Sequence, residues 1–307
     1  EMINFNWEGV MPAITTQFDA SENLNLKAFE INLKAQIDAG VHGIILGGTL
    51  GEASTLSADE KLQLLKKSQE IISRQIPIII NIAEQSTQDA ITVAQAAEAN
   101  GADGLMLLPP MRYKATDSET VQYFASIAQA TKLPIMIYNN PVDYKIEVTL
   151  DMFDQLQQFS NIQAVKESTR DISNVTRMIN RFGSRYKILC GVDTLAMESL
   201  VMGANGWVAG LVDAFPKETT AVFAYTKAKK IDEALAIYRW FLPLLELDIS
   251  PQLVQNIKQC EVATGIGTGH VRKPRIELKG SERIRVQKII DVSLATRPDL
   301  GNYKMFL

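Results

Sequence analysis

The stretch EANGADGLML (residues 98–107) runs from the end of a helical pattern, through Asn100 and Gly101, into a short apolar run. Two other stretches, DAGVHGIIL (38–46) and VMGANGWVAG (201–210), have the same order of elements. Glycine and asparagine end helices because they tolerate the left-handed backbone that the last turn often needs. The recurrence predicts a chain built from repeated strand–helix units.

Short apolar runs recur along most of the chain without strict alternation of apolar and polar residues, which is typical of parallel strands that are covered on both faces. These runs are GVMPAITTQF (9–18), GIILGG (43–48), PIIINIA (77–83), GLMLLPP (104–110), PIMIYNNP (134–141), IQAVKEST (162–169), KILCGVD (187–193) and GWVAGLV (206–212). Segments with helical spacing lie between them, such as Leu26–Ala39, Ala58–Ser73 and Thr87–Asn100. Ser57 and Glu60 fit a capping box that opens the second of these helices.

Eight strand–helix units from about residue 9 to residue 228 predict an α/β fold of the (β/α)8 TIM-barrel type. The alternative is an open, doubly wound sheet, and the absence of GxGxxG after the first run disfavours it. Residues 229–307 change character: IDEALAIYRWFLPLLELD (231–248), PQLVQNIKQCEVATG (251–265) and SERIRVQKIIDVSLAT (281–296) predict three helices. We therefore expect a catalytic barrel over 1–228 and a C-terminal three-helix extension over 229–307 that packs on it.

The composition excludes several classes of protein. A net charge of -4 in 307 residues offers no general attraction to nucleic acid or to an anionic membrane. The sequence has no run of eighteen apolar residues and no signal-peptide pattern at its start. Cys190 and Cys260 are far apart and form no CxxC pair, which indicates free thiols in a reducing cytoplasm. With two histidines and two cysteines, a structural zinc site is not expected.

Polar groups follow five of the predicted strands, and in a (β/α)8 barrel the active site lies at the C-terminal ends of the strands. The motifs at these ends are GGTLGE (47–52), PPMRY (109–113), YNNP (138–141), VKES (165–168) and CGVD (190–193). Because residues of different chemical types converge from distant parts of the sequence, this pattern favours a catalytic site over a layer of packing residues.

Lys166 stands in an otherwise apolar run. Its ordinary interpretation is a lysine whose stem is buried and whose ammonium reaches solvent. The alternative is a desolvated amine of lowered pKa, which is a nucleophile for a carbonyl carbon and forms a Schiff base.

Two neighbouring motifs allow similar pairs of interpretations. GGTLGE lacks the ending of a phosphate-binding loop, so it is either a tight turn or a set of backbone N–H groups, with the Thr49 hydroxyl, that holds a small carboxylate. Tyr138 is either a core aromatic residue with a solvated hydroxyl or a group that transfers protons.

GGTLGE, YNNP, VKES and GVD, in this order and at these spacings, resemble the dihydrodipicolinate synthase/N-acetylneuraminate lyase family. The resemblance covers nearly the whole chain. It implies a (β/α)8 barrel with a three-helix extension, commonly a homotetramer, and a small-molecule substrate. The implied chemistry needs no metal or cofactor: Lys166 forms an imine with a 2-oxo acid and Tyr138 relays protons. It further implies that Gly48, Thr49 and the backbone of Leu50 hold the substrate carboxylate, and that Gly191, Asp193 and Val208 line the cavity.

Three positions depart from the synthase pattern. Leu50 replaces the second of two adjacent hydroxyl residues, so the proton relay must be shortened or rewired. Asp143 stands where the synthase has an arginine that receives the carboxylate of its aldehyde substrate, and replacing a cation by an anion costs several kcal/mol, about 4 Å from a carboxylate at an effective dielectric of about 20. The tyrosine that the synthase lends across its dimer interface falls on Arg112, with Tyr113 one position later. A solvated loop aspartate is the alternative interpretation of Asp143.

These departures disfavour 4-hydroxy-tetrahydrodipicolinate synthase activity and favour a hydroxylated or iminium substrate. The run YNNPVDYKIEVT (138–149) resembles members of the family that deaminate and dehydrate a cyclic imine acid, pyrroline-4-hydroxy-2-carboxylate. The alternatives are an aldolase or dehydratase of 2-oxo-3-deoxy sugar acids or of 4-hydroxy-2-oxoglutarate, and a non-catalytic ligand-binding barrel that has kept its lysine.

Overall fold

The structure, a computed structural model, describes residues 3–110 and 112–307. Its strands are β1 (Gly9–Pro12), β2 (Ile44–Leu46), β3 (Ile78–Ile82), β4 (Gly104–Leu107), β5 (Ile135–Asn139), β6 (Ile162–Glu167), β7 (Lys187–Cys190) and β8 (Gly206–Ala209). They form one sheet in the order β1-β8-β7-β6-β5-β4-β3-β2. A parallel bridge between Ala13 and Ile45 links the two ends of this order. Sequential order with helices between the strands is the connectivity of a (β/α)8 barrel, and the predicted fold class is confirmed.

The helices alternate with the strands and continue beyond the last of them. They are α1 (Leu26–Ala39), α2 (Ala58–Ile72), α3 (Thr87–Ala99), α4 (Asp117–Ala130), α5 (Pro141–Tyr144), α6 (Leu150–Leu156), α7 (Ser173–Phe182), α8 (Ala196–Val201), α9 (Pro216–Lys227), α10 (Ile231–Leu245), α11 (Leu253–Thr264) and α12 (Gly280–Ala295). The three helices predicted after residue 229 are present as α10, α11 and α12. In the described residues, no helix is long and apolar enough to cross a membrane.

Local sequence explains where the helices begin. The Ser57 side chain accepts from the backbone N–H of Glu60, and the Glu60 carboxylate accepts from the Ser57 N–H, so the predicted capping box is confirmed. Thr116 and Glu119 form the same reciprocal pair at the start of α4. Because these caps satisfy N–H groups that the helix cannot pair itself, they fix the point at which each loop after a strand turns into a helix.

The chain forms two compact units that do not follow the predicted division at residue 228. The first unit comprises Glu1–Gly9 and Ile76–Val208, and the second comprises Val10–Gln75 and Ala209–Leu307. The division into a catalytic barrel over 1–228 and a C-terminal extension over 229–307 stays a prediction.

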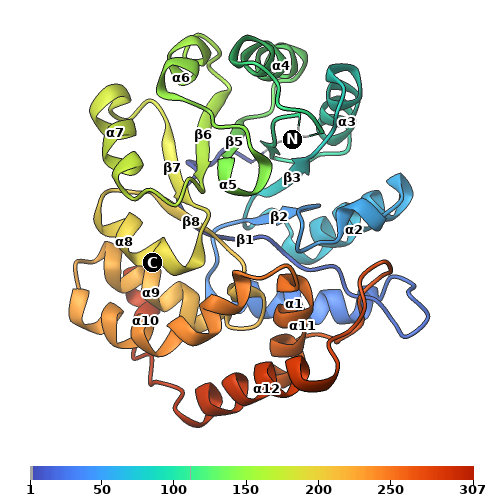
Figure 1. Cartoon of the computed structure of the whole chain (residues 1–307), viewed down its shortest axis with the longest axis vertical. Coiled ribbons are helices and arrows are strands. Elements are labelled where there is room, and N and C mark those ends of the chain that lie inside the picture. Colours follow the sequence, from blue (N-terminus) through green and yellow to red (C-terminus); the bar gives the residue numbers. More distant parts are fainter. Residues whose placement is uncertain (1–2, 111) are drawn as a thin grey trace. The chain divides into compact units, whose positions relative to one another are not determined.

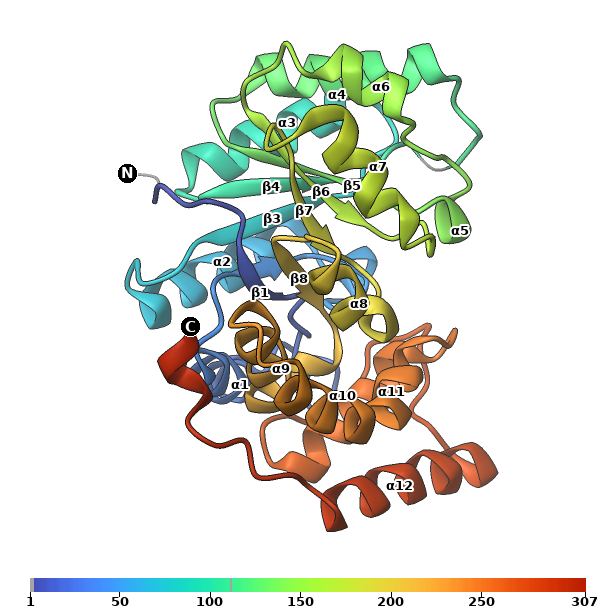
Figure 2. The same ribbon diagram turned by 90° about the vertical axis from the view of Figure 1, so that its left-hand side faces the viewer.

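In the first unit, neighbouring strands from β3 to β8 pair in parallel. Figure 2 shows α3, α4 and α6 along one side of β3, β4 and β5, and Figure 1 shows the same helices outside β3 and β5. The strand residues Leu105, Ile135 and Val165 have no exposed surface. Burial on both faces explains why these strands read as continuous apolar runs.

In the second unit, α9 packs on α1 and α10, and α12 packs on α10 and α11. Figure 2 shows α12 running beside α10 and α11. The C-terminal helices belong to the same compact unit as β2 and the GGTLGE loop that follows it.

Candidate active site

The pairing of β5 with β6 brings Lys166 and Tyr138 together. The two residues are register partners, so their side chains leave the sheet on the same face. The Lys166 ammonium lies 3.9 Å from the centroid of the Tyr138 ring, and only 9% of the lysine surface is exposed. An ammonium over an aromatic face is attracted by the ring quadrupole. The Lys166 amine therefore stays inside the protein and does not extend into bulk solvent. A reactive lysine needs such a sheltered amine.

Gly191 is the residue that makes room for the stem of Lys166. It follows β7, and its backbone N–H donates to the Glu167 carbonyl at 2.9 Å. A Cβ atom at Gly191 would lie 2.7 Å from Lys166 Cγ and 2.8 Å from Lys166 Cε. It would also lie 2.1 Å from Ser168 Oγ. Real Cβ atoms do not make such contacts, so the position of the lysine depends on a glycine here.

A hydrogen-bonded cluster extends from the Tyr138 hydroxyl. Asn140 Nδ2 donates to the Tyr138 hydroxyl at 3.1 Å and to Asp143 Oδ2 at 2.9 Å. Asn140 Oδ1 accepts from the backbone N–H of Asp143 and caps the short helix α5. Tyr144 packs edge-on against the Tyr138 ring, at 5.5 Å between centroids. Asp143 is thus connected to Tyr138 through one amide.

Arg170 completes this cluster and was missed by the sequence analysis. Its Nη1 donates to Asn140 Oδ1 and to the Ser168 carbonyl, each at 2.6 Å, and its Nη2 donates to Asp143 Oδ2 at 3.1 Å. The Arg170 guanidinium places a cation beside Asp143. The negative charge that Asp143 puts in place of the synthase arginine is therefore offset by a neighbouring positive charge. Arg170 follows β6 as Asn140 follows β5, and the adjacency of these strands was the signal that could have found the pair.

Asp193 and Val208 are buried in the first unit. Asp193 Oδ1 accepts from Trp207 Nε1 at 2.9 Å, and Asp193 and Trp207 are almost fully buried. Val208 follows Trp207 in β8 and is 3% exposed. The contact assigns Asp193 a structural part, because its carboxylate holds the indole of the neighbouring strand. The contact of Asp193 and Val208 with substrate stays a prediction.

The loop that carries Gly48, Thr49 and Leu50 belongs to the second unit. Its tight turn is closed by the Glu52 N–H, which donates to the Thr49 carbonyl at 2.9 Å. The Thr49 residue is exposed, whereas Leu50 is 5% exposed. The arrangement fits a loop that presents Thr49 and its backbone while Leu50 packs inward.

A buried ion pair anchors this loop. Glu52 Oε2 accepts from Lys258 Nζ at 2.6 Å, and neither side chain has exposed surface. Glu52 Oε1 accepts from the backbone N–H of Arg272 at 3.0 Å, and Lys258 also donates to the His270 carbonyl at 2.7 Å. Burial lowers the pKa of Lys258. No local motif in the sequence predicts this pair, because its members are 206 positions apart.

Tyr113 lies in the turn between β4 and α4, and the residue is 55% exposed. The backbone N–H of Arg112, one position earlier, donates to Gln85 Oε1 at 2.9 Å. Met111, the middle residue of PPMRY, lies outside the described residues. An exposed tyrosine in this turn is compatible with the predicted contribution to a neighbouring subunit, and that contribution stays a prediction.

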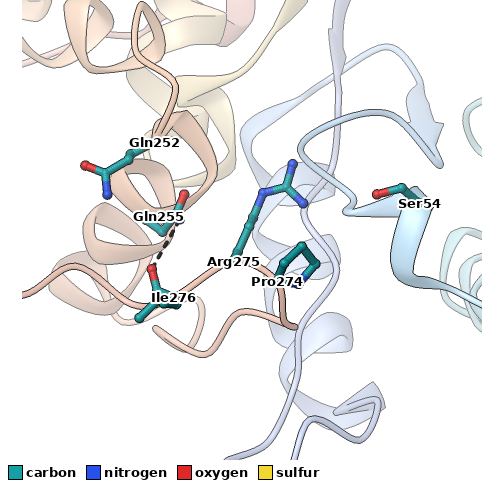
Figure 3. Close-up of a pocket in the computed structure, with 6 residues that line it drawn as sticks. All are labelled: Ser54, Gln252, Gln255, Pro274, Arg275 and Ile276. Carbon is teal, nitrogen blue, oxygen red and sulfur yellow. Dashed lines mark hydrogen bonds between the residues drawn. The ribbon is translucent and has the colours of Figure 1, made fainter. Parts of the chain in front are cut away.

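A separate cavity of about 520 Å³ lies in the second unit. It is lined by Ser54, Gln252, Gln255, Pro274, Arg275 and Ile276. Figure 3 shows the Arg275 guanidinium directed between α11 and Ser54, and Gln255 Nε2 donating to the Ile276 carbonyl at 3.2 Å. None of the predicted site residues lines this cavity, so it is not the predicted reaction site.

The family model described as "Dihydrodipicolinate synthetase family" matches residues 6–293 of the chain. A 4-hydroxy-tetrahydrodipicolinate synthase of Methanococcus aeolicus is 30% identical over 282 residues, which are 91% of this chain and 96% of that protein. A 4-hydroxy-tetrahydrodipicolinate synthase 2 of Halalkalibacterium halodurans is 27% identical and covers 92% of this chain and 97% of its own length.

Solved structures agree with this match. The 4-hydroxy-tetrahydrodipicolinate synthase of Methylacidiphilum fumariolicum has a TM-score of 0.87 and 27% identity, with 94% of this chain and 97% of that chain covered. The fold and these similarities define the protein as a class I lyase, an enzyme class that works through a Schiff base. The chain belongs to the dihydrodipicolinate synthetase family.

Proposed function

We propose that Lys166 forms a Schiff base with a 2-oxo acid or a cyclic imine acid, and that the enzyme dehydrates and deaminates a hydroxylated substrate such as pyrroline-4-hydroxy-2-carboxylate. The observation that carries the proposal is the Lys166 amine, buried against the face of Tyr138. A partly desolvated amine beside a phenol has both a nucleophile and a proton-transfer group for imine chemistry.

The reaction follows from the chemistry of the substrate class. The Lys166 nitrogen bonds to C2 of the cyclic imine, and the bond from C2 to the ring nitrogen breaks. A proton leaves C3 and the C4 hydroxyl leaves as water, a step in which Tyr138 transfers the proton. Protons then move from C5 and its nitrogen to C3 and C4, which removes the new double bond and turns the C5 amine into an imine. One water molecule hydrolyses this C5 imine and releases ammonia, and another releases the product from Lys166. Each bond that breaks is activated by the imine, so the chemistry asked of the protein is proton transfer and orientation.

The remaining predicted residues act in binding under this proposal. Gly48, Thr49 and the Leu50 backbone hold the carboxylate next to the reacting carbon, and Tyr113 acts at a neighbouring site in a homotetramer. The homotetramer and a cytoplasmic location are part of the proposal, and the two buried free thiols, Cys190 and Cys260, are compatible with a reducing compartment.

A second candidate function is 4-hydroxy-tetrahydrodipicolinate synthase. Arg170 supports it, because its guanidinium offers a cation for a substrate carboxylate although Asp143 stands nearby. The names of the relatives at 27% to 30% identity also support it. Leu50, which removes one hydroxyl from the relay, remains the argument against it. An aldolase of 4-hydroxy-2-oxoglutarate or of 2-oxo-3-deoxy sugar acids shares the same first step.

One set of assays separates these functions. The enzyme is incubated with pyrroline-4-hydroxy-2-carboxylate, with 4-hydroxy-2-oxoglutarate, with a 2-oxo-3-deoxy sugar acid, and with pyruvate plus aspartate semialdehyde. The proposal expects ammonia from the first substrate and no pyruvate. Pyruvate from the second or third substrate would establish an aldolase, and consumption of both partners in the last would establish the synthase. A chain that traps no substrate with borohydride is a non-catalytic binder, and that outcome would overturn the proposal.

A further inference from the structure

The side-chain amide of Asn140 is fully hydrogen-bonded. Its oxygen accepts from Arg170 Nη1 at 2.6 Å and from the Asp143 backbone N–H at 3.1 Å. Its nitrogen donates to Asp143 Oδ2 at 2.9 Å and to the Tyr138 hydroxyl at 3.1 Å. An amide has two acceptor sites and two donor hydrogens, so all four are used. Asn140 is 2% exposed and is therefore shielded from exchange with water.

These partners determine which way the amide faces. A guanidinium and a backbone N–H can only donate, so the atom that faces Arg170 and the Asp143 N–H must be the oxygen. The nitrogen then faces Tyr138, and the phenol oxygen must accept at this contact. A phenol has one hydrogen, and Tyr138 must direct it elsewhere. The Lys166 ammonium lies over the same ring, at 3.9 Å from its centroid.

We infer that Asn140 is a positioning residue that fixes Tyr138 as a proton donor toward the reacting substrate. The inference rests on the proposed proton transfer by Tyr138. Asn140 does this by donating to the phenol oxygen, which also stabilises that oxygen once its proton has left. Arg170 and Asp143 hold the amide in place, so Asp143 acts on the site through Asn140.

A purely structural role for Asn140 makes a different prediction. Its oxygen caps α5 by accepting from the Asp143 N–H. Asn140→Asp keeps this cap and the bond from Arg170, because a carboxylate accepts both. The same substitution replaces the donor that faces both Tyr138 and Asp143 Oδ2 by an acceptor, so it also sets two carboxylates against each other whether or not Tyr138 has its hydroxyl. If the role is only structural, Asn140→Asp has the same effect with Tyr138 as with Tyr138→Phe.

The test uses pyruvate, so it does not depend on the natural substrate. The imine of pyruvate exchanges the methyl hydrogens of pyruvate for deuterium in D2O, and proton NMR measures the rate. We expect Asn140→Asp to slow exchange by about ten- to a hundred-fold, the range for one hydrogen bond to a charged group. In a Tyr138→Phe background the same change should have less than about a two-fold effect, because contributions that act through one hydroxyl are not additive.

Arg170→Met is the second variant, since it leaves Asn140 and its cap in place. It should slow exchange by a smaller factor, and again only when Tyr138 is present. Borohydride trapping with pyruvate is measured on the same samples. A wild type that traps no pyruvate would overturn the proposed function. Two results in a wild type that traps pyruvate would overturn the role of Asn140. One is exchange at the wild-type rate in Asn140→Asp, and the other is an equally large effect of Asn140→Asp in the Tyr138→Phe background.

Discussion

Gly191→Ala tests whether the placement of Lys166 is set by the glycine beside its stem. The new methyl group would lie 2.7 Å from Lys166 Cγ, whereas ordinary contacts begin at 3.4 Å. Ser168 Oγ, which would be 2.1 Å from the new methyl group, must turn away and the lysine stem must move by about 0.7 Å, or the backbone of Gly191 must move instead. Overpacking of this kind costs about 1–3 kcal/mol of stability. The backbone resists movement because the Gly191 N–H is bonded to the Glu167 carbonyl.

The functional cost follows from the displacement of the amine. Cγ and Cε both lie within 2.8 Å of the added methyl group, so the clash cannot be relieved by turning the ammonium end alone. A misplacement of about 1 Å at a reacting group costs about a hundred-fold in rate. We therefore expect imine formation with pyruvate to slow by about that factor in Gly191→Ala, even in protein that remains folded.

The assay is rapid mixing with pyruvate, quenching with borohydride at fixed times, and intact mass of the protein. Gly269→Ala is the matched control, because its methyl group would meet Val262 Cγ2 at an ordinary 3.7 Å. Thermal unfolding is recorded for both variants. Imine formation at the wild-type rate in Gly191→Ala, with unchanged stability, would refute the claim that this glycine positions Lys166.

Three further predictions concern the reaction, the buried ion pair and pH. Tyr138→Phe should lower kcat and kcat/KM together by about 10²- to 10⁴-fold, and a raised KM with unchanged kcat would mean that Tyr138 only holds substrate. Lys258→Met should lower the free energy of unfolding in urea by about 3–5 kcal/mol, because it leaves the carboxylate of Glu52 buried without its cation; a loss below about 1 kcal/mol would contradict this. Burial raises the pKa of Glu261 from 4.5 to about 7, so its contribution to stability is fully present below about pH 4.5 and is lost as the pH rises through 7. Unfolding in urea between pH 4.5 and 8 should show this loss in the wild type and not in Glu261→Gln.

The fold could be predicted because its signals are local. Apolar runs without alternation marked the strands, and the Ser57 and Glu60 pair marked the start of α2. The predicted strand through Thr169 ends at Glu167 in the structure, since the chain turns at Arg170, which has a positive φ of 65°. Helix and strand boundaries depend on such turns, and a non-glycine residue with positive φ gives little warning in the sequence.

The site could be predicted only in part because its contacts are long-range. Lys166 and Tyr138 were found from their positions at strand ends, and the pairing of β5 and β6 brings them together. Asn140 and Arg170 are 30 positions apart and meet through the same pairing. Because Arg170 lies beside Asp143 only in the folded chain, the effect of Asp143 on a substrate charge could not be judged from its position in the motif. Charge substitutions in a motif therefore need their spatial neighbours before they are used to exclude a substrate.

The central claim is that Lys166 is the amine that forms the covalent intermediate. The most direct measurement is treatment of the protein with pyruvate and borohydride, followed by proteolysis and mass spectrometry of the peptides. We expect one reduced pyruvate adduct, located on Lys166, and no adduct in Lys166→Ala. An adduct on another lysine, or trapping that persists in Lys166→Ala, would contradict the assignment.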